Sequence, residues 1–128
     1  IKKTIILYIK RFSNSKDLII KKWPSKSNLN AWYVKLIQQG YQNSHIHPDG
    51  WISGVFYLKV PKFINKQDGS IKLTIDGYDY PVNKRLPSLV HSPKDFDLIL
   101  FPSSLFHRTI PFRLKETRHV IAFDLIPL

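Results

Sequence analysis

The chain has 128 residues, a hydrophobic content of 43% and a formal net charge of +11. This length fits one domain with one buried core, and the absence of cysteine excludes disulfides, thiolate metal ligands and cysteine nucleophiles. No apolar run approaches the length of a membrane span and no signal peptide opens the chain, so we expect a cytoplasmic protein without membrane partners.

The positive charge is concentrated in the first quarter of the chain, where eight of the first 26 residues are lysine or arginine. Such a field suits an anionic small ligand or an acidic partner. Aromatic residues are not interleaved with these lysines, as they are on surfaces that stack bases, so nucleic acid is the weaker alternative.

The first nine residues mix apolar and β-branched side chains with lysine, which is compatible with a strand or with the end of a helix. Residues 17–23 are a short amphipathic segment that Pro24 ends, and residues 25–30 are expected to form a polar loop.

Beyond residue 30, the alternation of apolar and polar side chains predicts mainly strands. We expect them, in chain order, at 31–37, around the histidine pair at 45–47, and at 51–60, 71–75, 96–101, 105–111 and 117–126. Loop chemistry at 65–70, with Asp68-Gly69, and again at Asp76-Gly77 predicts tight turns, and residues 78–93, with three prolines, are expected to be irregular. Many short strands at close spacing predict a mainly β protein, an antiparallel sandwich or barrel with short N-terminal helical or irregular segments.

The histidines suggest a site. His45 and His47 are two residues apart, so on a strand they would point to the same face. Histidine is the commonest metal ligand, and His107, in a distant strand-like segment, is the best third candidate. The alternative is that all three are ordinary surface or core residues.

Asp49 is the competing ligand. It would share the face of His45 and His47 on a straight strand, but Pro48-Asp49-Gly50 is typical of a turn. A step of four residues along a strand also spans roughly 13 Å, too far for one metal ion to bridge. We therefore favour His45, His47 and His107.

These motifs together resemble the iron(II)- and 2-oxoglutarate-dependent oxygenases, in particular a bacterial and phage group similar to prolyl hydroxylases. The shared pattern is H-x-H-P, then S-G-x-x-Y-L, then F-P-S-x-x-x-H, then an arginine, covering residues 43–123 approximately. The resemblance implies a double-stranded β-helix, the jelly-roll or cupin-like barrel. It also implies one oxygenase-like domain over residues 1–128. Because this group occurs as the C-terminal module of longer proteins and the chain contains no methionine, we expect a longer protein here too.

The resemblance also implies roles for individual residues. His45 and His107 match iron ligands. His47 stands where the family usually has a carboxylate, which raises the charge of the site by one. Arg118 matches the base that pairs with the far carboxylate of 2-oxoglutarate, and Tyr57 matches a tyrosine that hydrogen-bonds the same group. Either could instead be structural: Arg118 on the surface, Tyr57 in the core.

The implied function is oxidative decarboxylation of 2-oxoglutarate to succinate, coupled to hydroxylation of a prime substrate that is a peptide or a small molecule. Fe(II), 2-oxoglutarate and O2 are the implied partners, with ascorbate as a reductant. Two alternatives remain open: a cupin-type metal-dependent dioxygenase or isomerase that does not use 2-oxoglutarate, and a β-barrel binding module without catalysis.

The remaining polar residues are expected to be structural. We expect His91 and His119 at structural or surface positions, and Asp97 and Asp124 in turns or at sheet edges. Trp32 and Trp51 are expected to form core or pocket wall.

Overall fold

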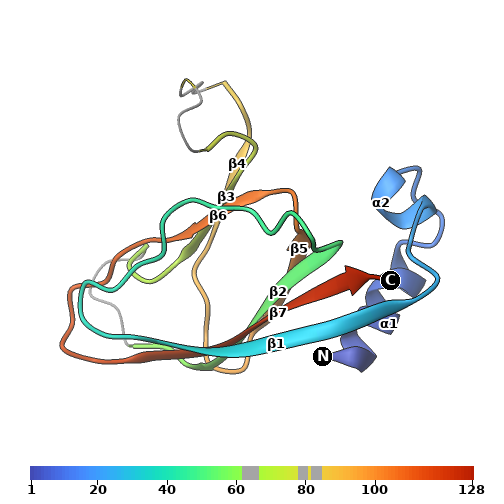
Figure 1. Ribbon diagram of the computed structural model, residues 1–128. Helices are drawn as coiled ribbons and strands as arrows, with labels where there is room; N and C mark the ends of the chain where they lie inside the picture. Colours follow the sequence, from blue (N-terminus) through green and yellow to red (C-terminus); the bar gives the residue numbers. More distant parts are fainter. Residues whose placement is uncertain (62–66, 78–80, 82–84) are drawn as a thin grey trace.

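The structure is a computed structural model, and it describes residues 1–61, 67–77, 81 and 85–128. Two helices open the chain, and seven strands follow in the described parts (Figure 1). Their bounds are α1 (Lys2–Arg11), α2 (Leu18–Lys21), β1 (Ser27–Leu36), β2 (Ile52–Lys59), β3 (Ile71–Thr74), β4 (Ser88–His91), β5 (Leu98–Pro102), β6 (Phe106–Thr109) and β7 (Arg118–Pro127).

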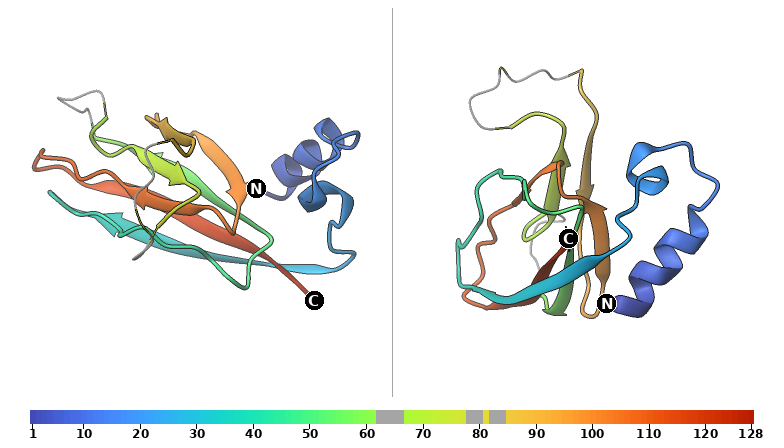
Figure 2. Two further views of the ribbon diagram at one scale, coloured as in Figure 1. Left: turned by 90° about the horizontal axis from the view of Figure 1, so that it is seen from above. Right: turned by 45° about the vertical axis from the view of Figure 1, so that its right-hand side comes forward.

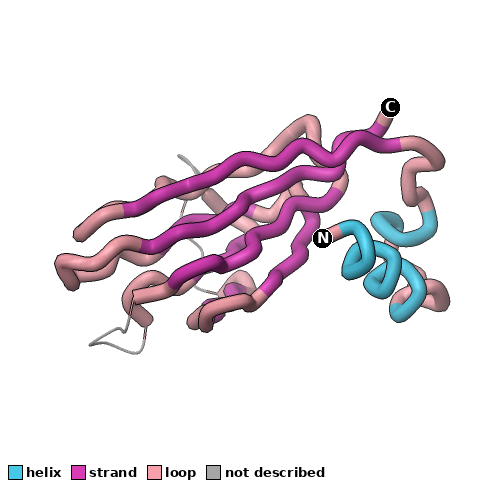
Figure 3. The backbone as a smooth tube through the Cα atoms, turned by 90° about the horizontal axis from the view of Figure 1, so that it is seen from below, coloured by secondary structure: helices cyan, strands magenta, loops and turns pink. Residues whose placement is uncertain are grey.

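The strands form two antiparallel sheets that face each other (Figure 2). The larger sheet has the order β1-β7-β2-β5, and its four strands run side by side in Figure 3. The smaller sheet has the order β4-β3-β6. Strands adjacent in space are mostly far apart in sequence, so the chain passes back and forth between the two layers, as the expected jelly roll requires.

Successive side chains of a strand point to opposite faces, so β7 contributes to two separate cores. The inner core lies between the sheets and consists of the buried residues Val55, Tyr57, Ile71, Phe101 and Val120. Alternate residues of β7, Phe123 and Leu125, lie on the outer face of the larger sheet instead.

Helix α1 covers part of that outer face. Its apolar residues recur at helical spacing, and Ile5, Tyr8 and Ile9 pack with Phe123 and Leu125. Both helices lie at the end of the sheets nearest the C-terminus (Figures 1 and 3). None of the described helices combines the length and the apolar character that a membrane crossing needs.

Helix α2 is tied to the sheet through a side chain. The indole Nε1 of Trp51 donates a hydrogen bond of 2.9 Å to the carbonyl of Ile19. Trp51 also packs against the buried residues of the outer face, so the expectation that it forms part of a core is confirmed.

The structure shows helices near the N-terminus, and it corrects the loops expected over 25–30 and 78–93. The first residues form a helix, and residues 17–23 contain the helical turn α2. The polar loop expected over 25–30 is wrong, because β1 already begins at Ser27. The irregular segment expected over 78–93 is wrong at Ser88–His91, which forms β4; residues 78–80 and 82–84 lie outside the described part.

The predicted turn at Asp68-Gly69 is present, and Gly69 has a φ of 66°. Residues 65 and 66 of the expected loop lie outside the described part. The strand predicted around the histidine pair is wrong as a continuous element: residues 41–51 form a loop that contains one isolated bridge, between His45 and His107.

Candidate metal centre

Three histidines predicted from the sequence converge in the structure. One ring nitrogen of each of His45, His47 and His107 lies within 4.8 Å of the others. The ring centroids are 4.2 Å apart for His45 and His107, 5.0 Å for His47 and His107, and 5.2 Å for His45 and His47. We call these three side chains the histidine cluster.

Backbone hydrogen bonds hold the loop of His45 and His47 against β6 and the residues before it. His45 and His107 exchange both backbone bonds, at 3.0 and 2.9 Å, and the N–H of His47 donates to the carbonyl of Ser103 at 3.0 Å. This segment is therefore extended, so residues two apart still point the same way, as the sequence predicted for a strand.

A turn ends the extended segment directly after His47. The N–H of Gly50 donates to the carbonyl of His47 at 3.0 Å, and a Cβ at Gly50 would lie 2.5 Å from Ser103 Oγ, so only glycine fits. Asp49 is exposed within this turn and is not part of the histidine cluster, as its turn chemistry predicts.

Each imidazole of the cluster makes a hydrogen bond through Nδ1. The partners are the carbonyl of Asn43 for His45 at 2.6 Å, the carbonyl of Leu105 for His107 at 3.2 Å, and the carboxylate of Asp124 for His47 at 2.6 Å. All three partners are acceptors, so each Nδ1 carries the proton when the ring is neutral. The three Nε2 atoms then keep their lone pairs, which is the form that binds a metal ion.

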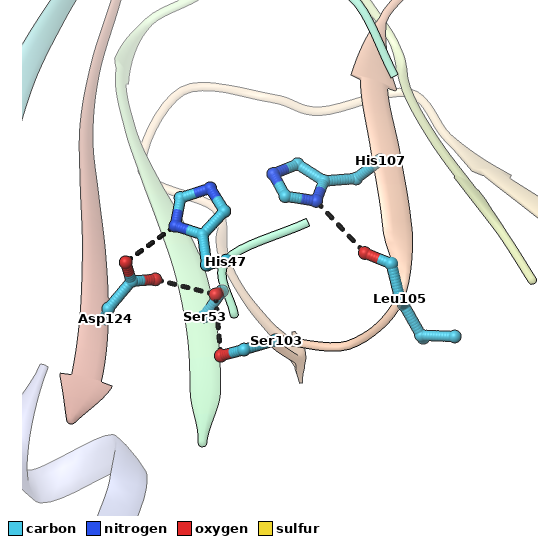
Figure 4. A network of polar contacts seen from close by, with 6 residues as sticks. All are labelled: His47, Ser53, Ser103, Leu105, His107 and Asp124. Atoms are coloured by element: carbon cyan, nitrogen blue, oxygen red, sulfur yellow. Dashed lines mark hydrogen bonds and ion pairs between the residues drawn. The ribbon is translucent and has the colours of Figure 1, made fainter. Parts of the chain in front are cut away.

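Figure 4 shows the Asp124 side of this arrangement. Asp124 is 8% exposed and lies on β7, between β1 and β2. The expectation that it is a turn or edge residue is therefore wrong. Asp97 does follow a turn, where its carboxylate accepts the backbone N–H of Lys94 at 2.9 Å.

The electrostatics of the cluster favour a neutral ring at His107. Burial, together with the nearby ring of His45, lowers the pKa of His107 to about 4. At neutral pH no proton has to leave His107 before a cation binds. The indole of Trp32 stacks on His47, with centroids 5.6 Å apart and planes 19° from parallel, so it forms a wall of the site as expected.

Arg118 lines the same cavity as the histidine cluster. It is only 2% exposed, and neither Nε nor Nη1 has a hydrogen-bond partner among the described residues. The alternative that Arg118 lies on the surface is therefore wrong. A buried guanidinium with open donors is costly unless an anion completes it.

Tyr57 lies beside Arg118, whose Cζ is 4.9 Å from the centre of the tyrosine ring. Tyr57 is fully buried in the inner core, and its hydroxyl also lacks a described partner. Burial raises the pKa of Tyr57, while the positive charge of Arg118 opposes that rise. The hydroxyl is therefore a neutral donor.

His91 and His119 lie outside the cluster. His91 Nε2 contacts the Asp97 carboxylate at 3.2 Å, and both side chains are more than one-third exposed. His119 Nε2 contacts the hydroxyl of Thr117 at 2.6 Å. These positions fit the structural roles expected for both.

The residues present fit iron and an anionic co-substrate. Imidazole nitrogen suits Fe(II). Two donors on one ion, at bonds of about 2 Å, lie at most about 4 Å apart, so small side-chain rotations would close the triad. The open donors of Arg118 fit an anionic oxygen, because a hydrogen bond from a guanidinium to a carboxylate is charge-assisted and strong.

Solved structures share this fold. A prolyl-4-hydroxylase from Pseudomonas putida matches 79% of the chain, with a TM-score of 0.62 and 13% sequence identity. An oxidoreductase of the 2OG-Fe(II) oxygenase family from Burkholderia pseudomallei matches 91% of the chain, with a TM-score of 0.60 and 12% sequence identity. The chain spans 52% and 48% of their lengths. HygX from Streptomyces hygroscopicus, solved with iron bound, matches 93% of the chain and 67% of its own length, with a TM-score of 0.56 and 12% identity.

No protein with a curated description matches the sequence. A family model does match, over residues 30–124, and its description reads "Putative 2OG-Fe(II) oxygenase". This match includes every residue of the histidine cluster together with Tyr57, Arg118 and Asp124. The chain belongs to the 2OG-Fe(II) oxygenase family.

Proposed function

We propose that this chain carries the active site of an iron(II)- and 2-oxoglutarate-dependent hydroxylase. His45, His47 and His107 would hold Fe(II) through Nε2. Arg118 would bind the far carboxylate of 2-oxoglutarate, with a hydrogen bond from Tyr57. When bound, iron and 2-oxoglutarate supply the oxidative chemistry, in which 2-oxoglutarate and O2 give succinate, carbon dioxide and a hydroxylated product.

The observation that carries the proposal is the buried, incompletely paired Arg118 in the cavity of the histidine cluster. A three-histidine site alone would suit a cupin-type dioxygenase or isomerase equally well. A buried guanidinium with open donors next to the cluster favours a reaction that uses a dicarboxylate, and so supports 2-oxoglutarate.

The protein's own groups would have three tasks. The Nδ1 hydrogen bonds fix the orientation of the three imidazoles, Arg118 and Tyr57 orient the co-substrate, and the apolar residues of the inner core exclude water from its far end. Trp32 lines the cavity and is 39% exposed, so a prime substrate would approach on its side.

We propose a peptide side chain as the prime substrate. The support is that one of the structural relatives is a prolyl-4-hydroxylase.

The test is succinate formation from 2-oxoglutarate without any prime substrate, because uncoupled turnover reports the site alone. Purified protein is loaded anaerobically with Fe(II) and ascorbate and then exposed to oxygen. We expect succinate release that requires both iron and 2-oxoglutarate and that His107→Ala abolishes. Metal binding without affinity for 2-oxoglutarate would instead support a cupin-type reaction, and no metal binding would support a binding module.

A further inference from the structure

Asp124 has a connection to the histidine cluster that the proposed ligand roles do not use. In the register of the larger sheet it lies opposite Asn30 on one side and Ser53 on the other. Its side chain points inward on the same face of β7 as Arg118, because the two are six residues apart. It is thus the carboxylate that the larger sheet presents to the cluster.

Both oxygens of this carboxylate have partners (Figure 4). Oδ2 accepts the Nδ1–H of His47 at 2.6 Å, and Oδ1 lies 2.6 Å from Ser53 Oγ. Ser53 Oγ also lies 2.8 Å from Ser103 Oγ. Ser53 has one hydroxyl proton, and both the carboxylate and Ser103 Oγ lie within reach as acceptors for it.

The two serines are almost completely buried, at 2% and 0% exposure. This chain of hydrogen bonds therefore leaves the carboxylate little freedom to turn. A fixed carboxylate in turn fixes the ring plane of His47 and its tautomer. The other two imidazoles of the cluster bond only to backbone carbonyls through Nδ1.

The carboxylate of Asp124 also affects the net charge around the metal position. Three neutral imidazoles bring no negative charge to a dication. Among the described residues, Asp124 is the carboxylate that hydrogen-bonds to a member of the cluster. Its charge reaches the metal position through one imidazole ring, which becomes a stronger donor when its N–H bonds to an anion.

We propose that Asp124 is a positioning residue that makes His47 an effective metal ligand and supplies the anionic charge the three-histidine site otherwise lacks. This inference rests on the proposed function, since it assumes that the cluster holds a divalent metal ion. Ser53 and Ser103 support Asp124 by fixing its second oxygen.

The test measures metal affinity rather than turnover. Anaerobic titration calorimetry with Fe(II), and with Co(II) as a spectroscopic substitute, gives the dissociation constant for the wild type, Asp124→Asn and Asp124→Ala. An asparagine can still accept the hydrogen bond of His47 but carries no charge. We expect the dissociation constant to rise about 10–100-fold in Asp124→Ala, with Asp124→Asn between it and the wild type.

The chain offers a matched control in Asp97→Asn, because Asp97 pairs with His91 outside the cluster. This variant should bind metal as the wild type does. A second readout is the visible absorption spectrum of the Co(II) complex. It should change in both Asp124 variants, whereas a residue needed only for folding would leave the spectrum of the folded fraction unchanged.

If Asp124→Ala does not fold, Ser53→Ala serves instead, because it frees the carboxylate without removing it, and a several-fold loss of affinity is expected.

The outcomes separate the two proposals. If the wild type binds metal and folded Asp124→Asn binds it equally well with an unchanged Co(II) spectrum, the inference about Asp124 is wrong while the proposed function stands. If the wild type binds neither Fe(II) nor Co(II), the proposed function itself fails.

Discussion

Replacing Arg118 by methionine should weaken co-substrate binding and stabilise the metal-free protein at the same time. Methionine has a similar length and no charge. In the structure, Arg118 is 2% exposed and has two donor nitrogens without a described partner. The guanidinium is thus poorly satisfied until a carboxylate arrives, so its contributions to folding and to binding have opposite signs.

The two magnitudes follow from these contacts. Loss of a charged partner from a buried pair costs about 2–5 kcal/mol, which corresponds to a weakening of 2-oxoglutarate binding by roughly 30-fold to several thousand-fold. Each unmade buried hydrogen bond costs about 1–3 kcal/mol, whereas the stacking of Arg118 on Tyr57 recovers about 1–2 kcal/mol. Two such bonds less the stacking leave about 0–5 kcal/mol, so exchange for an apolar side chain should raise the free energy of unfolding by up to about 5 kcal/mol.

Two measurements on the same variant check this prediction. Calorimetric titration of the metal-loaded protein with 2-oxoglutarate under nitrogen gives the affinity, and urea unfolding of the metal-free protein gives the stability. Arg113→Met is the matched control, because Arg113 is exposed in the loop before β7, and it should change neither quantity by much. An Arg118→Met protein that binds 2-oxoglutarate normally would refute the assignment, and one that is strongly destabilised would refute the argument about unmade hydrogen bonds.

Three further predictions concern the metal ligands and Tyr57. His47→Ala should abolish stoichiometric Fe(II) binding whereas Asp49→Ala should leave it intact; metal analysis giving the reverse would make Asp49 the ligand. Tyr57→Phe should weaken 2-oxoglutarate binding by about 1 kcal/mol without lowering the stability of the metal-free protein, because its hydroxyl has no described partner to lose; calorimetry and urea unfolding measure both. As the pH falls from about 6.5 to about 4, the metal-free protein should lose up to ~3 kcal/mol of stability. The reason is that the unfolded chain takes up a proton at His107 near pH 6.5, whereas the folded chain does so only near pH 4. A His107→Asn variant with the same pH dependence of stability would rule this out.

The strands that sequence reasoning predicted are those with clear alternation or a strong apolar content, such as β2 and β7. The first half of β1 was missed because Ser27, Asn28 and Asn30 are typical of loops, and only pairing with β7 makes them a strand. β4 was missed because it is four residues long, in a proline-rich region, and is held by its register with β3.

Sequence reasoning likewise found some residues of the site and misjudged others. The histidines and Arg118 were found from motif spacing, but the loop of His45 and His47 looked like a strand because an extended loop and a strand share one side-chain period. Asp124 was misjudged as a turn or edge residue. The signal for it was present: the alternation that turns Arg118 inward also turns Asp124 inward, since 118, 120, 122 and 124 share a face.

The histidine cluster joins the two layers of the sandwich. His107 lies on β6 of the smaller sheet, whereas His47 is anchored by its side chain to β7 of the larger one. An ion held by both would act as a removable cross-link that closes a loop of roughly 60 residues, the interval between the two positions, and would restrict the unfolded chain as a disulfide does. A protein without cysteine would in this way obtain a reversible cross-link between its two sheets. Removing the ion with a chelator should loosen the smaller sheet first, and amide hydrogen exchange should then become faster in β3 and β6 than in β7.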